Sequence, residues 1–275
     1  APFSAVMAEL PGIWTANHRG DGVVLLSTIS RSVKSENFLD IYPNGVPVAS
    51  MVAKWQKCPD LWADDPTDES QWTWTENVIR HLAHYKLVRE GVDYATKIAP
   101  TIDYWRAAQD VCDEDIPLKA GGTEKRWRSC LSHTHTQKHG DVTAALLATC
   151  DGWIAPRSDG ALVVYAGKYY EPTVTIGPEH ITAYEWAGVG VDDDSAVNSI
   201  TCSYVSAAHD YNTVECDAWI DEDDILARGQ ELTDSLDPQV PSHGQVRRLA
   251  KRMMQRTNAL YRGTVTTNVA GRIAR

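Results

Sequence analysis

The sequence predicts an α+β protein in which helices pack beside small sheets. One stretch, residues 139–176, has the pattern of a helix, a sharp stop, a β-hairpin and a third strand. Alternating patterns typical of strands recur at residues 180–189 and 197–205. The segment that begins at Ser242 has the clearest helical pattern in the chain.

The composition places the chain among globular proteins. It has 275 residues, of which 43% are hydrophobic and 23% are charged. No apolar run approaches the roughly 20 residues that a bilayer-spanning helix needs, so no membrane span is expected. The formal net charge of -11 argues against nucleic-acid binding by broad phosphate neutralisation.

Cysteine spacing and aromatic content give two further expectations. The six cysteines contain no C-x-x-C pair and no zinc-finger spacing, so we expect free, mostly buried thiols from a reducing compartment. Ten tryptophans and eleven tyrosines stand against two phenylalanines. Such amphipathic rings are enriched at protein interfaces, although filling of strand cores is the preferred interpretation for most of them.

The first 60 residues are expected to be a β-rich segment, either an inserted domain or part of one. Strands are predicted at residues 23–33 and 46–55, with Pro43-Asn44-Gly45 in the loop between them. Residues 58–75 are rich in Asp, Pro, Thr, Ser and Trp, which indicates a connection. Thr75 is placed to cap the helix that starts near Val78.

The central part is expected to alternate helices and strands. Apolar stripes predict helices over residues 78–87 and 104–112, and Gly121-Gly122 precedes a predicted strand at 124–131. His133 and His135 lie at i and i+2, where they could share a metal, but no third ligand is apparent and polar residues at a strand end are the preferred interpretation.

The stretch at residues 139–176 begins and turns at recognisable residues. Asp141 is the predicted N-cap of its helix and Gly152 the stop. Asp159-Gly160 supplies the turn of the hairpin that follows.

Two acidic runs flank the predicted strands of the C-terminal part. The first could hold a hard cation but lacks EF-hand spacing, so a solvated turn is preferred. The second precedes a short helical piece that ends at Gly229. The runs comprise Asp192, Asp193 and Asp194, and Asp221, Glu222, Asp223 and Asp224.

The last helix combines a capping box with a basic surface. Ser242 and Gln245 occupy the capping-box positions, and a closing strand is predicted at residues 265–269. A solvated face is the default interpretation for the basic residues on its polar sides, and contact with carboxylates of their own chain or of a neighbouring subunit is the alternative. They are Arg247, Arg248, Lys251, Arg252 and Arg256.

The order of these segments over roughly residues 60–270 resembles the hub proteins of tailed-phage tail tips, the lambda-type tail tip attachment (host specificity) family, and their gene transfer agent relatives. The first matching segments are the connection and helix at 65–87, Ala107-Ala108-Gln109-Asp110-Val111-Cys112-Asp113-Glu114 and Gly121-Gly122-Thr123-Glu124. They are followed by the helix and hairpin at 141–165, the strands to 176 and at 197–205, the acidic segment at 219–224 and the helix from Ser242. Family members are often several times longer, and this chain begins at Ala1 without a methionine, so a fragment or a shortened hub is expected.

The resemblance implies a hub of small β-barrel-like domains with packed helices at residues 61–275, assembled as a homotrimeric ring around the tail axis. Its implied place is the virion tail tip, after assembly in the bacterial host cytoplasm. Implied partners are the distal tail protein, the tail tube, other tail tip proteins and the tape measure protein, while DNA passes through without specific binding. The family brings no catalytic residue, cofactor or metal. We hypothesise that at least one acidic run lines the channel and that the basic helix lies between subunits.

The alternative function is a tail-associated cell-wall glycosidase. Such enzymes use two carboxylates about 5–10 Å apart, and Glu124 with Asp141 is one candidate pair. The sequence has no G-x-S-x-G, H-E-x-x-H, P-loop or G-x-G-x-x-G motif. A structural, non-enzymatic role is therefore the preferred interpretation.

Overall fold

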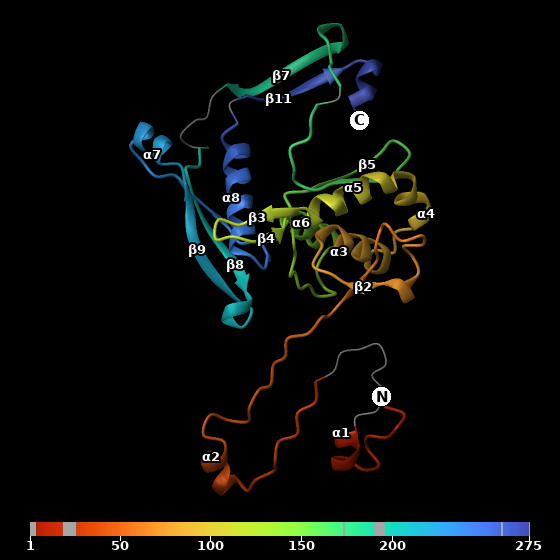
Figure 1. The fold of residues 1–275 in the computed structure, drawn as a ribbon, viewed down its shortest axis with the longest axis vertical. Coiled ribbons are helices and arrows are strands. Elements are labelled where there is room, and N and C mark those ends of the chain that lie inside the picture. The colour runs from red at the N-terminus through yellow and green to blue at the C-terminus, as the bar shows by residue number, and fades with distance from the viewer. Residues whose placement is uncertain (1–3, 19–25, 173, 190–195, 260, 275) are drawn as a thin grey trace. The chain divides into compact units, whose positions relative to one another are not determined.

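The computed structural model describes residues 4–18, 26–172, 174–189, 196–259 and 261–274 (Figure 1). The chain forms two units, Ala1–Gln56 and Lys57–Arg275. The sequence placed the boundary at residue 60.

The first unit contains short helices and, among its described residues, no strand. The helices are α1 (Ser4–Glu9), the 3₁₀ turn η1 (Ser35–Asn37) and α2 (Phe38–Ile41). The strand expected at residues 46–55 is not formed, and neither is the described part of the one expected at 23–33. Val48 and Val52 are 96% and 72% exposed, so their alternation has no partner strand or core to bury against.

The second unit begins with a group of helices. They are η2 (Glu69–Gln71), α3 (Val78–His84), the π-helical turn η3 (Tyr85–Arg89), α4 (Tyr94–Lys97), η4 (Ala99–Thr101), α5 (Ile102–Asp113) and α6 (His139–Ala148). Helix α3 packs against both α5 and α6. The helices expected at 78–87 and 104–112 are therefore confirmed.

Two expected helix caps are wrong by two or three residues. The N-cap of α3 is Asn77, whose side-chain oxygen accepts from the Ile79 and Arg80 amides, while Thr75 Oγ1 accepts from the Asn77 amide. Helix α6 starts before Asp141, which lies in its first turn, because Tyr85 already holds His139 through a 2.9 Å contact between Tyr85 Oη and His139 Nδ1.

The strands form small sheets. Pairs are β1 (Lys57–Cys58) with β2 (Thr73–Trp74), β3 (Asp115–Pro117) with β4 (Thr123–Lys125), β5 (Trp153–Pro156) with β6 (Leu162–Tyr165), and β7 (Ile181–Val189) with β11 (Tyr261–Thr267). The three-stranded sheet has the order β10 (Thr233–Leu236), β8 (Ser199–Ser206), β9 (Asn212–Ile220). The mixed α and β class is confirmed.

The expectation of β-barrel-like domains is wrong for the described residues, which contain no closed barrel. A sheet closes into a barrel only when a continuous series of tilted strands pairs around an axis, and these sheets have only two or three strands each. The strand expected at 124–131 ends at Lys125, because Trp127 turns into the core and Arg128 bridges to Asn77. The third strand expected near 172–176 is not formed in its described part.

The remaining helical pieces lie toward the C-terminus. They are η5 (Pro178–His180), η6 (Ala207–His209), α7 (Glu222–Arg228), α8 (His243–Thr257) and η7 (Val269–Ala274). Helix α8 packs on β8 and β9 (Figure 1). No helix among the described residues is both long and apolar enough for a bilayer crossing.

One hydrophobic core joins the helical group to α8 and β8. Trp105 and Trp127 are at most 1% exposed, and their indole N–H groups donate to the carbonyls of Leu162 and Gly167 at 2.8 and 2.9 Å. These two tryptophans therefore fill the core, as one of the two interpretations of the aromatic content expected. Trp62, Trp153 and Trp186 instead remain more than half exposed.

Candidate assembly surface

A two-stranded ribbon, β7 with β11, carries two exposed aromatic side chains, Tyr184 and Trp186. In the described chain these two strands pair antiparallel with each other and with no third strand. The register shifts twice, so β7 has two residues more than β11 over the paired length. Such bulges increase the twist of a ribbon and are typical of sheet edges.

One face of the ribbon presents Tyr184, Trp186 and Val265. Tyr184 and Trp186 are two residues apart on β7, and Val265 lies directly opposite Tyr184. They are 68%, 55% and 47% exposed, and the two rings lie 6.2 Å apart between centroids. Apolar side chains of this size on a two-stranded ribbon form a surface that a partner could cover.

A glycine fixes the position of the tryptophan. Gly263 lies opposite Trp186, and a Cβ at this position would come within 2.8 Å of Trp186 Cε3 and 2.5 Å of the Glu185 carbonyl oxygen. A larger residue at 263 would therefore displace the indole ring. The ring covers the glycine, as aromatic residues commonly do next to glycines in exposed strands.

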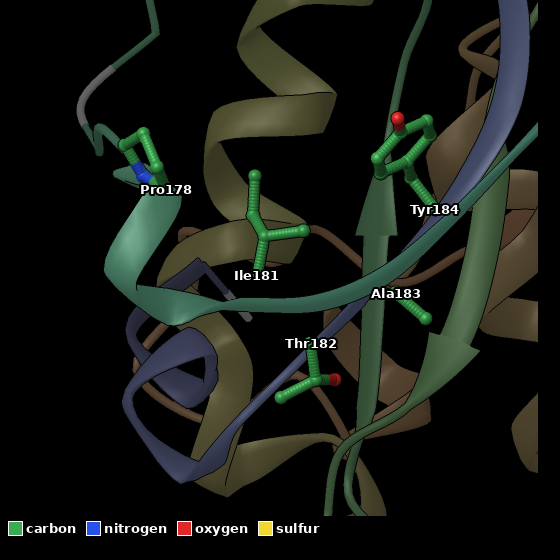
Figure 2. Close-up of a pocket in the computed structure, with 5 residues that line it drawn as sticks. All are labelled: Pro178, Ile181, Thr182, Ala183 and Tyr184. Carbon is green, nitrogen blue, oxygen red and sulfur yellow. The ribbon is translucent and has the colours of Figure 1, made fainter.

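The start of β7 lines a shallow hollow (Figure 2). Its volume is about 500 Å³, and its lining is Pro178, Ile181, Thr182, Ala183 and Tyr184. Figure 2 shows Ile181 and Tyr184 pointing to the same side of the strand and Thr182 to the other. The register shift between Thr266 and Thr267 explains this, because an extra residue reverses the normal alternation.

Three of the five basic residues predicted on α8 are paired with carboxylates of this chain. Arg248 binds Glu124 at 2.6 Å, while Arg252 and Arg256 bind the two carboxylate oxygens of Asp151 at 2.6 and 2.5 Å. The sequence left open whether such carboxylates belong to the same chain or to a neighbouring subunit. These three arginines contact carboxylates of their own chain.

The other two basic residues lie against Trp219 of β9. The guanidinium carbon of Arg247 is 5.2 Å from the ring centroid, and Lys251 Nζ is 5.8 Å from it. Arg247 also donates to the carbonyl oxygens of Asp217 and Ala218. Cation–π contacts of this length hold both cations against the sheet.

In the second acidic run, residues 221–224, two carboxylates make hydrogen bonds within the fold and two are exposed. Asp221 is the N-cap of α7 and accepts from the Asp224 amide, and Asp224 binds Asn198 and Arg228. Glu222 and Asp223 are exposed. Asp192, Asp193 and Asp194 lie outside the described residues, so their place in the fold is not described.

The acidic run and the basic helix line one polar hollow of about 660 Å³. Asp221, Glu222 and Asp223 lie on one side, and Lys251 and Gln255 of α8 on the other. The sequence did not place these two features together, because their contact depends on how α8 packs on β9.

Two histidines of the segment 133–139 contact the ring of Tyr85. Tyr85 is 5.1 Å from His133 and 5.7 Å from His139 between ring centroids, in edge-to-face geometry. Burial lowers the pKa of His133. Among the described residues no group of three or more His, Cys, Asp or Glu side chains has the geometry of a metal site.

Glu124 is an ion-pair partner. Its carboxylate accepts from Ser242 and pairs with both Arg248 and Arg128. Burial raises its pKa, but these hydrogen bonds and charges outweigh burial and lower the pKa overall. A glycosidase acid needs the opposite shift. Asp141, its proposed partner, lies exposed in the first turn of α6.

The six cysteines are free thiols. Cys58, Cys112, Cys150 and Cys202 are buried, Cys216 is partly buried and Cys130 is exposed.

The sequence reasoning missed the β7–β11 ribbon as a site. Alternation predicted β7, but the strand that pairs with it lies about 80 residues further along the chain. The available signal was the spacing of Tyr184 and Trp186, which places two large rings on one face of a strand.

No protein family model and no curated protein matches this chain.

Proposed function

We propose that this chain is a structural component of the tail tip of a phage or phage-like particle. In this proposal three copies form a hub ring that joins the tail tube to the tip and surrounds the DNA exit channel. The proposed partners are the distal tail, tail tube, tape measure and other tail tip proteins. The proposal rests on the order of segments in the sequence and on one structural observation, the β7–β11 ribbon.

The ribbon supports an assembly role for a physical reason. Two-stranded sheets are marginally stable in water, and this one also leaves Tyr184 and Trp186 more than half exposed. A neighbouring subunit can pair with a free strand edge and cover the aromatic face, which removes apolar area from water. We therefore place the subunit interface on the ribbon. Helix α8 is a weaker candidate because Arg248, Arg252 and Arg256 already have partners in their own chain.

The acidic run at α7 fits a channel lining in the same proposal. Glu222 and Asp223 are its exposed members, and a carboxylate surface does not retain DNA because adhesion scales with the number of neutralised phosphates. An assembled structure with Glu222 and Asp223 on the outer surface would refute this part of the proposal.

The first experiment measures the oligomeric state. Light scattering on the purified chain over a wide concentration range should give the mass of a trimer. Tyr184→Ser and Trp186→Ser should each weaken association, by about 2 kcal/mol or roughly 30-fold per interface, as is typical of central aromatic residues. Tyr169→Ser, which removes a 72% exposed tyrosine outside the ribbon, should leave association unchanged.

The second experiment places the chain in a particle. Electron microscopy of assembled tails should show three-fold density at the tip into which this chain can be traced. A chain that stays monomeric at high concentration and is absent from the tip would contradict the proposal.

The glycosidase remains the alternative, and no contact among the described residues favours it. Release of sugar from purified cell wall by this chain would favour the enzyme, and loss of that activity in Glu124→Gln would identify the carboxylate.

A further inference from the structure

We propose that Cys202 and Cys216 form a thiol-oxidation site, at which a small-molecule disulfide such as oxidised glutathione converts the pair into an intramolecular disulfide. The bond would tie β8 to β9 beneath helix α8. This inference is independent of the assembly role.

The register of the sheet brings the two cysteines together. Cys202 and Cys216 are direct partners on the antiparallel strands β8 and β9, so their side chains share one face. Directly opposed Cβ atoms lie roughly 4.5–5.5 Å apart, and a disulfide needs about 3.5–4.5 Å. A register shift between Ile200 and Cys202 interrupts the ladder beside the pair, where a small approach of the strands is easiest. Each thiol also shifts the pKa of the other, as expected for neighbouring side chains on one face of the sheet.

The two sulfurs differ in how an oxidant reaches them. Cys216 is partly exposed and belongs to β9, an edge strand of the sheet. Cys202 is 3% exposed on the central strand β8. An external disulfide therefore meets Cys216 first, and Cys202 reacts only through it.

The chemistry proceeds in two exchange steps. The Cys216 thiolate attacks one sulfur of the external disulfide, forms a mixed disulfide and releases one thiolate of the small molecule. The Cys202 thiolate then attacks the Cys216 sulfur and displaces the second thiolate. The protein loses two electrons and two protons, and the external disulfide gains them as two thiols.

Two other sites in the chain serve as internal comparisons. Cys112 and Cys150 are also neighbours, since Cys150 raises the pKa of Cys112, but both are fully buried in the core, so no small molecule reaches them in the folded protein. Cys130 is exposed and forms no such thiol pair, so it can take up glutathione but cannot pass it on.

The rate of the reaction should depend steeply on pH. Burial and the neighbouring Cys202 raise the pKa of Cys216 to about 11, although the Arg247 charge opposes this shift. The reactive thiolate is therefore a minor species at neutral pH. Its fraction, and the rate of the first step, should rise about tenfold per pH unit below that pKa.

The test treats the full chain with oxidised glutathione at pH 8.5 and maps the products by mass spectrometry. The expected product links the peptides that contain Cys202 and Cys216, with a loss of two hydrogens and reversal by dithiothreitol. Cys112 and Cys150 should be alkylated only after unfolding. The oxidised protein should also unfold at a temperature roughly 5–10 °C higher, as expected for a closed loop of this length.

Variants separate the proposed site from general thiol reactivity. Cys202→Ser should leave Cys216 as a stable glutathione adduct, while Cys130→Ser should form the 202–216 link as the wild type does. The proposal is overturned if wild-type Cys216 stops at the adduct with Cys202 still reduced. It is equally overturned if the pair stays reduced while Cys130 takes up glutathione.

Discussion

At the scale of single residues, a buried glutamine connects segments that are distant in sequence. Gln245 occupies a capping-box position, and its backbone amide donates to Ser242 Oγ as the sequence predicted. Its side chain does not return to the N-cap. It accepts from the Arg128 amide and donates to the Arg128 and Thr149 carbonyls at 3.0, 2.7 and 2.8 Å. Gln245 therefore holds the start of α8 against the end of α6 and the segment after β4.

The variant Gln245→Leu should cost about 2–4 kcal/mol of unfolding free energy. The leucine fills a similar volume but cannot make the three hydrogen bonds by which the buried Gln245 side chain satisfies backbone groups of Arg128 and Thr149. Urea unfolding followed by fluorescence measures the loss. Gln255→Leu on the exposed face of the same helix is the control and should change stability by less than about 0.5 kcal/mol. Equal effects of the two variants would contradict this role of Gln245.

A buried histidine should make stability depend on pH. Burial, together with the charges of Arg89, His81 and His133, lowers the pKa of His84 to about 4. The unfolded chain has the ordinary pKa of about 6.5, so it binds the proton more readily than the folded protein between these values. The stabilisation is therefore present above about pH 6.5 and is lost as the pH falls toward 4, by roughly 3 kcal/mol in total.

His84→Gln should flatten this dependence between pH 6.5 and 4. Unfolding free energies measured across that range give the comparison, with His209→Gln at the surface as the control. Burial also lowers the pKa of His81, so a smaller slope of the same sign should remain in His84→Gln. An unchanged curve would show that folding does not lower the pKa of His84.

At the scale of elements, local signals predicted which segments are helix or strand better than where they end. The turn at Gly160, where φ is +81°, forms the β5–β6 hairpin as the Asp-Gly pair predicted. The stripe after Ser242 predicted α8, and Gly229 ends α7 in a left-handed conformation. The boundaries of α3 and α6 differed because contacts of Asn77 and His139 with other elements decided them.

The acidic run contains a helix cap that can be tested separately from its charge. Asp221→Ala should destabilise α7 by about 1 kcal/mol, because the Asp224 amide loses its side-chain acceptor. Hydrogen exchange of the α7 amides should become faster by roughly fivefold. Glu231→Ala, which removes an exposed carboxylate beyond the end of α7, should leave those rates unchanged. Equal exchange in both variants would remove Asp221 from the cap.

At the scale of the whole molecule, burial is confined to one of the two units. No described residue of the first unit is buried, whereas the core of the second runs from Leu61 to Met254. The described part of the first unit has therefore no core of its own on which a cooperative transition could depend.

Removal of residues 1–56 should leave thermal unfolding of the rest nearly unchanged. The midpoint of the truncated chain should lie within about 2 °C of the full-length value, because no buried core contact is lost. Calorimetry of both forms makes the comparison. A much lower midpoint would show that the first unit stabilises the second.

The sequence by itself determined the mixed class, the existence of α3, α5, α8 and β8, and the β5–β6 hairpin. Apolar spacing and turn chemistry act between neighbours in the chain, so they can be recognised in one sequence. Tertiary structure decided the pairing of Glu124 with Arg248, of Asp151 with Arg252 and of β7 with β11. These contacts join residues about 70 to 125 positions apart, and no local pattern specifies which distant partner a charge or a strand edge will meet.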